Sequence, residues 1–484
     1  MTGPRLGVLV ESPFGILTTL DSGQNLVLWS VSPMRKFQLQ GLLLVLFLGG
    51  IQAAAGQPKV PRLSFTDQRL ENGLRVIIAP DHSAPVYSIA VTYNVGSRNE
   101  RPGRTGFAHL FEHMMFQGSE NVGKGEHFIL VLNNGGGMNG TTNEDRTNFF
   151  EELPKNQLDL GLFLEADRMR ALAVNQANLD NQRNAVQEER RLGVDNQPYG
   201  KSELEIDNLS YDNFAYKHST IGSMADLDAA GVEDVKEFFR IYYAPDNAVL
   251  TLVGDLDPQD TLEKVKKYFG AIPSQPPPPK VDLAEPEHFG ERREVIYDPL
   301  ARLPRLLISY HIPAGNTPGN LSAQVLAYIL SAGQSSRFYQ HLVKDKQLAV
   351  SVQAMPDARI GPSLFYIIGT PRPGVKPEDL EKAINEEIEA VRKDGVTSQE
   401  IEKVRTQYLL GRIQSRESSL SAAIQLGQYT VYFNDPDLIN TLFDKFNAVT
   451  AAQVQEAAQE FLVASGRTVV TTLPASSQAK PAGR

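Results

Sequence analysis

The chain contains two halves with the same order of expected elements, separated by a proline-rich stretch at residues 273–280. Proline fixes a backbone angle, so this stretch is expected to form an extended, semi-rigid linker. A repeat of this length predicts an α+β fold with two homologous domains, each a mainly antiparallel sheet covered by helices, rather than a solenoid of short repeats. We expect the two domains to form a clam-shell.

Each half is expected to open with a strand and to pass through an apolar helix that ends near Gly118 or Gly333; further strands and a long charged helical stretch follow. Each half then closes with a helix and a strand. The expected strands are 89–95 and 306–312, the charged stretches 156–195 and 376–414, and the closing units 232–252 and 451–472. The predicted boundaries are 62–272 and 291–475 for the domains, 273–290 for the linker and 476–484 for a tail.

The N-terminal region carries the pattern of a secretory signal peptide at residues 34–55. Arg35 and Lys36 precede a short apolar run at residues 42–48, and small residues end the segment at Ala55. We predict cleavage after Ala55, with retention as an anchor as the alternative, and we read residues 1–33 as an extension upstream of the true start. This pattern predicts a secreted protein, and we expect the periplasm of a Gram-negative bacterium.

Composition excludes several classes of function. The formal net charge is −10, and no cluster of Lys and Arg appears that could neutralise phosphates, which argues against binding to nucleic acid. The chain has no cysteine, which excludes disulfides, a cysteine nucleophile and thiolate metal sites.

The most informative motif is His109-Leu110-Phe111-Glu112-His113, an H-x-x-E-H pattern within an apolar helical run. Residues three and four apart share one face of a helix, so both imidazoles and the carboxylate point the same way. Two such histidines can bind one zinc ion, and the carboxylate can take a proton from an attacking water. This order is the inverted zincin signature. The alternative is a chance pair of core histidines.

A hydrolytic zinc site needs a third protein ligand. The charged stretch offers two adjacent carboxylates, Glu188 and Glu189. The motif and these carboxylates resemble the pitrilysin/insulinase family of inverted zinc peptidases, of the small bacterial two-domain type related to mitochondrial processing peptidase subunits. The resemblance covers residues 62–475. It implies one Zn²⁺ per chain held by His109, His113 and Glu189, with Glu112 as general base.

This sequence departs from the family pattern at Gln182, where the family usually has a glutamate seven residues before the ligand. A second matching stretch begins at Asn139 and runs to Thr147, and it resembles the family's strand beside the metal. Such a strand can bind a peptide as an added strand, so Asn139 is the predicted substrate contact; the alternative is a turn residue after three glycines. Residues 135–140 also match G-x-G-x-x-G, but a preceding helix and a following strand are the wrong context for a dinucleotide.

The second half is predicted to lack a metal site. Aligned on the two glycines, it has Gln324, Ala327 and Tyr328 in place of the three motif residues. Single-subunit members of the family donate an Arg and a Tyr, seven apart, from this half; the local match gives Val343 and Val350. We therefore expect a homologous partner subunit to supply the Arg/Tyr pair. The competing explanation is local substitution by Arg337, Tyr339 or Lys344.

Together these features predict a secreted zinc metalloendopeptidase for peptides or unfolded segments, acting as the metal-bearing subunit of a heterodimer. The alternative is a catalytically silent structural or binding subunit of a peptidase-like complex. We expect no membrane span after signal cleavage. The remaining histidines are read as ordinary surface or core residues: His82, His127, His218, His288, His311 and His341.

Overall fold

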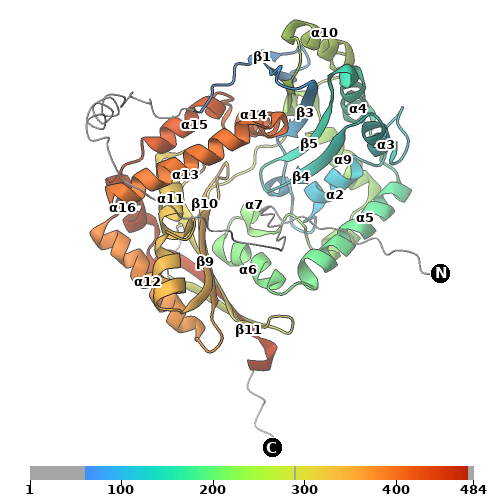
Figure 1. The fold of residues 1–484 in the computed structure, drawn as a ribbon. Coiled ribbons are helices and arrows are strands. Elements are labelled where there is room, and N and C mark those ends of the chain that lie inside the picture. Colours follow the sequence, from blue (N-terminus) through green and yellow to red (C-terminus); the bar gives the residue numbers. More distant parts are fainter. Residues whose placement is uncertain (1–59, 288–289, 478–484) are drawn as a thin grey trace, which may run out of the picture. The chain divides into compact units, whose positions relative to one another are not determined.

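The computed structural model describes residues 60–287 and 290–477 of the chain. The predicted signal peptide and the residues upstream of it lie outside the described residues. Within the described part, no helix combines the length and the apolar character that a membrane crossing requires. The described residues form two β-sheets and many helices, which confirms the α+β class (Figure 1).

The first sheet has six strands in the order β1-β2-β6-β3-β5-β4. Strand β6 is buried along its whole length and β3 along nearly all of it, as expected for central strands that are covered on both faces. The β2–β6 pair is parallel and the other pairs are antiparallel. Strand β4 lies at one edge. The bounds are β1 Thr66–Arg69, β2 Arg75–Pro80, β3 Val86–Tyr93, β4 Gly137–Thr142, β5 Thr147–Pro154 and β6 Ala248–Gly254.

The second sheet repeats this topology with five strands in the order β7-β11-β8-β10-β9. Its parallel pair is β7–β11, in the position that β2–β6 takes in the first sheet. Strand β9 is therefore the counterpart of the edge strand β4. The bounds are β7 Arg292–Asp298, β8 Arg305–Ile312, β9 Ala349–Pro356, β10 Ser363–Pro371 and β11 Arg467–Pro474.

Each long charged stretch is helical, as predicted, and is divided into two main helices. The first divides into α4 (Leu158–Ala171) and α5 (Gln176–Arg190), because the Asn175 side chain accepts a hydrogen bond from the Asn178 N–H and starts a new helix. The second divides into α12 (Pro377–Asp394) and α13 (Ser398–Arg416) around Gly395, which has a φ of 75°. Other helices are α2 Phe107–Met114, α3 Glu126–Asn133, α9 Val232–Tyr242, α10 Pro258–Phe269, α11 Pro318–Ser331, α15 Leu438–Asn447 and α16 Ala451–Phe461.

The two halves exchange one helix each. Helix α14 (Ser419–Phe433), from the second half, packs on β3 and β6, where its Ala423 and Leu426 join the apolar core beside Ala90. Helix α6 (Gly200–Ser210), from the first half, packs on β8 and β11 of the second sheet. The approach of α14 is close, since a Cβ on Gly427 would lie 2.3 Å from Thr92 Oγ1. Each sheet thus needs the other half to cover one of its faces.

Candidate metal centre

Helix α2 carries the H-x-x-E-H motif, and its N-terminus is held by a buried carboxylate that the sequence analysis did not single out. Glu100 accepts hydrogen bonds from Gly106 N at 2.9 Å and from Ala108 N at 2.7 Å, and it contacts His218 Nε2 at 2.9 Å. Burial raises the pKa of Glu100, although these contacts oppose the rise. An anion at this end satisfies unpaired N–H groups and the helix dipole. The start of α2 is therefore fixed.

The three predicted ligands converge. His109 and His113 lie one turn apart on α2, with ring centroids 4.8 Å apart, and Glu189 stands in the last turn of α5. Glu189 Oε2 lies 3.2 Å from His113 Nε2 and 3.7 Å from His109 Nε2. One ligand atom from each residue falls within 4.8 Å of the others. Two imidazoles and one carboxylate form the donor set of a hydrolytic zinc site, so these residues fit a zinc ion.

Gln182 lies behind His113. Its Oε1 is 3.3 Å from His113 Nδ1, so it can accept the ring N–H and leave Nε2 as the free lone pair. At this position the family usually has a glutamate, and this chain contacts His113 through the neutral amide of Gln182 instead. His109 Nδ1 is buried and has no hydrogen-bond partner among the described residues.

The side chain of Glu112 points from α2 toward the edge strand β4. Its Oε2 accepts a hydrogen bond from Thr142 Oγ1 at 2.5 Å. Gly140 permits a close approach, because a Cβ there would lie 3.1 Å from Glu112 Cγ and 3.2 Å from Phe149 Cδ1. Burial raises the pKa of Glu112 and outweighs the Thr142 hydrogen bond, which makes this carboxylate a better proton acceptor.

The charges of the three ligand side chains affect one another's pKa values. Burial, with the neighbouring His113, lowers the pKa of His109 to about 4, so this imidazole is neutral at pH 7 and keeps a lone pair for a metal. Burial also favours a lower pKa for His113, but the hydrogen bond and the charge of Glu189 outweigh burial, and the pKa of His113 is raised. The hydrogen bond with His113 lowers the pKa of Glu189 in turn.

Asn139 lies within strand β4 and is exposed at the edge of the first sheet. Its Oδ1 accepts a hydrogen bond from Gly140 N at 2.9 Å. The glycines before it follow helix α3 and lead into this strand, which is not the strand-to-helix turn of a dinucleotide site. An edge strand offers unpaired backbone groups to another extended chain.

In the second half, the counterparts of the motif residues lie on α11. Gln324, Ala327 and Tyr328 border an open cavity of about 410 Å³ next to β9. The groups of side chains within the described residues that could hold a metal all lie in the first half. One of them joins His127, Glu151 and Glu165, three buried side chains from α3, β5 and α4.

That second group is an ion network rather than an open site. His127 Nε2 lies 2.6 Å from Glu151 Oε1, and Arg168 pairs with Glu165. The guanidinium also stacks over Phe149, with 4.5 Å from its carbon to the ring centroid. A fixed arginine already supplies the positive charge there, so His127 is a satisfied core residue.

The valines at the expected Arg and Tyr positions differ in environment. Val343 packs against the core of the second half, whereas Val350 on β9 is exposed. Of the local substitutes, Arg337 is engaged by Glu400, with 2.7 Å between its Nε and Oε1. Lys344 is exposed and donates to Gln340 Oε1.

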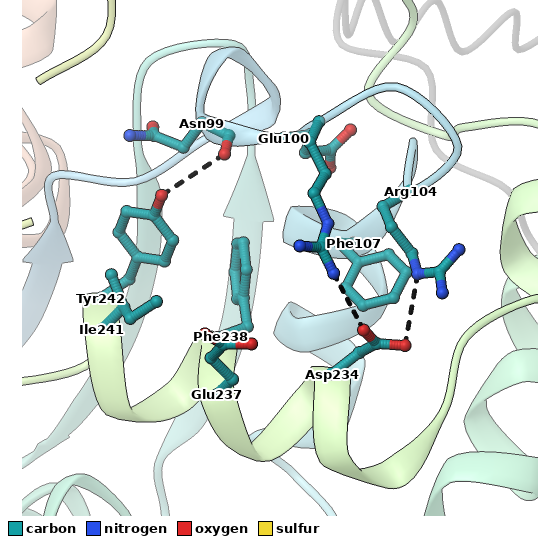
Figure 2. A pocket seen from close by; sticks show the side chains of 10 residues that line it. Asn99, Glu100, Arg104, Phe107, Asp234, Glu237, Phe238, Ile241 and Tyr242 are labelled. Carbon is teal, nitrogen blue, oxygen red and sulfur yellow. Dashed lines mark hydrogen bonds and ion pairs between the residues drawn. The ribbon is translucent and has the colours of Figure 1, made fainter. Parts of the chain in front are cut away.

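A separate cavity of about 250 Å³ lies between the start of α2 and helix α9 (Figure 2). Phe107 and Phe238 form its apolar wall. Arg101 and Arg104 reach across it to the Asp234 carboxylate, at 3.1 and 3.2 Å. None of the candidate zinc ligands lines this cavity.

Comparison with known proteins places the chain in a family. Residues 75–222 match the family described as "Insulinase (Peptidase family M16)", and residues 230–408 match "Peptidase M16 inactive domain". The chain belongs to the insulinase family, peptidase family M16, as its motif predicted. Relatives of this chain carry the name zinc protease, which supports a zinc peptidase.

One such relative is zinc protease PqqE of Helicobacter pylori, which is 30% identical over 92% of this chain and 99% of its own. The crystal structure of a protease from Helicobacter pylori superposes with a TM-score of 0.82 at 29% identity, covering 85% of this chain and 100% of that one. The first half of the periplasmic protease PqqL from Escherichia coli shares the fold, with a TM-score of 0.70 at 17% identity, over 86% and 93% of the two chains.

Proposed function

We propose that this chain is a zinc metalloendopeptidase that hydrolyses peptides or unfolded segments. One observation carries the proposal: the ligand atoms of His109, His113 and Glu189 converge beside the buried carboxylate of Glu112 and the edge strand β4. This arrangement supports the proposal, because it would bring a metal site, a proton acceptor and a surface for an extended chain together.

Different residues of the chain bind the substrate and transfer the proton. Strand β4 pairs with the backbone of the substrate, and Asn139 at its edge contacts that backbone. A bound zinc ion would supply Lewis acidity toward the scissile carbonyl and the attacking water. Glu112 takes a proton from that water and returns it to the leaving amine, while Thr142 holds the carboxylate in place.

We further propose that the active form is a heterodimer with a homologous subunit. Val343 and Val350 cannot donate hydrogen bonds, and loss of one donor to a developing oxyanion typically costs about 100- to 1000-fold in rate. Arg337 is held by Glu400 and is therefore a poor local substitute. The partner would supply an arginine and a tyrosine.

We also propose export to the periplasm. The basic start, the apolar run and the small residues of positions 34–55 support cleavage after Ala55. Sequencing the N-terminus of the protein recovered from the periplasmic fraction tests this, and a start at Met1 or Met34 would contradict it.

The test of the activity is hydrolysis of a quenched fluorescent peptide library by the zinc-loaded chain, with and without a chelator. Cleavage that the chelator abolishes and that Glu112→Gln removes without loss of zinc supports the peptidase. Cleavage by the lone chain at the rate of the complex would refute the need for a partner. Bound zinc without turnover, even after co-purification with a homologous subunit, would refute the peptidase.

A further inference from the structure

An arginine that forms no hydrogen bond with a carboxylate of the described residues lies beside the edge strand of the candidate site. Arg146 stands in the turn between β4 and β5, and its Nη1 donates to Thr141 O at 2.7 Å and to Thr141 Oγ1 at 2.6 Å. Its Nε is buried and has no hydrogen-bond partner in the described part of the chain. Charged groups that are largely removed from water are normally paired. This guanidinium therefore has hydrogen-bonding capacity to spare.

The side chain of Thr141 points to the face of β4 that is turned away from the metal centre. Side chains alternate along a strand, and Gly140 and Thr142 face Glu112. Asn139 pairs with Phe150, which packs with the core under α14, so Asn139 and Thr141 face the α14 side. Both residues are exposed. The half-buried Arg146 thus lies beside this exposed strip of Asn139 and Thr141, next to the edge where a peptide would pair and close enough to Glu112 for the two charges to interact.

A peptide that adds to β4 would place every second side chain on this strip. We infer that Arg146 binds a carboxylate of the substrate and makes the peptidase selective for an acidic residue at one position, on the face away from Glu112. The inference rests on the proposed function and specifies its substrate class. The chain's net charge of −10 would not favour acidic peptides by itself, so the preference must come from a local cation.

The experiment compares peptides in which a single Glu or its Gln counterpart moves along an otherwise neutral sequence. For the zinc-loaded wild-type chain, with its partner if one is required, Glu at one position should raise kcat/KM roughly tenfold over Gln, the size of one charge-assisted hydrogen bond. Arg146→Gln should abolish this ratio while neutral peptides are still cleaved. Arg146→Glu should reverse it, so that a Lys at the same position is preferred.

Controls separate this inference from its alternatives. Arg101→Gln removes a similar charge from the other cavity and should leave the Glu/Gln ratio unchanged. Amidated peptides distinguish a side-chain carboxylate from the C-terminal one, and a preference lost on amidation would overturn the side-chain assignment. The reversed preference of Arg146→Glu guards against a merely misfolded variant, because misfolding creates no new selectivity.

Binding provides a readout that does not need turnover. The zinc-loaded Glu112→Gln variant should bind the Glu peptide more tightly than the Gln peptide, and added salt should narrow the difference. Equal affinities, or a ratio that survives Arg146→Gln, would refute the role of Arg146 while leaving the peptidase intact. Absence of cleavage of every peptide, with these affinities still different, would instead refute the proposed activity.

Discussion

The contact between Gln182 and His113 predicts that this chain binds zinc more weakly than a variant with a glutamate at position 182 would. A neutral amide oxygen 3.3 Å from His113 Nδ1 is long for an N–H···O bond, which is usually about 2.9–3.0 Å. A carboxylate acceptor shortens such a bond and makes it roughly twice as strong. Net values of about 1 kcal/mol for a neutral bond and about 2 kcal/mol for a charged one differ by about 1 kcal/mol, or somewhat under tenfold in affinity. Gln182→Glu should therefore tighten zinc binding by roughly 5- to 10-fold.

The assay is competition for zinc against a chromophoric chelator at constant pH. Gln182→Glu also removes the hydrogen bond from Gln182 Nε2 to Asn181 Oδ1, an oxygen that still accepts from Lys124 Nζ at 3.2 Å. Gln182→Ala, which removes the acceptor, should weaken binding. Gln176→Glu adds the same charge at the exposed start of α5 and controls for a general effect of charge. Unchanged affinity in Gln182→Glu, or an equal gain in Gln176→Glu, would refute the reasoning.

Three further predictions follow from the structure. Glu112→Gln should retain zinc, measured by metal analysis, and lose at least about 100-fold in kcat, because the proton acceptor is gone; loss of zinc would contradict this role. Asn139→Ala should raise KM with kcat less affected, in peptide kinetics, because it removes a contact to bound substrate and not to the reacting atoms. Burial opposes ionisation of Glu400, but hydrogen bonds from Arg337 and Thr397 outweigh it and hold its pKa at about 2. Because this pKa is depressed below about 4.3 in the unfolded chain, its contribution to stability is complete above that pH and is lost as the pH falls toward 2. Arg337→Ala should flatten this acid dependence in thermal unfolding scans.

The sequence predicts well those features that depend on local spacing. The i, i+4 histidines share a face of α2 in any helix, and the order of elements in each half follows from the hydrophobic pattern. The break between α4 and α5 lies in the uncharged stretch 171–179, and the capping role of Asn175 shows only in its hydrogen bond with Asn178 N–H. Glu100 and Arg146 were missed by the sequence analysis. The partners of Glu100, which are two N–H groups at the start of α2 and His218, come together only in the folded chain, and Arg146 reaches Thr141 only when β4 and β5 form their hairpin.

The second half has no group of metal-binding side chains among its described residues. It nevertheless supports the candidate metal centre of the first half. The turn after β4 is held from that half: Tyr432 Oη on α14 lies 2.8 Å from Asn143 Nδ2, and Ile360 N donates to Asp145 Oδ2 at 2.8 Å. Asp145 is buried and also binds Arg98 Nη1 at 2.6 Å. An edge strand has hydrogen-bonded support on one side only. Because β4 carries Thr142 and precedes Arg146, the contacts of the second half fix the strand that holds Glu112 and that we propose receives the substrate. A mutation there can therefore reduce activity without touching a zinc ligand.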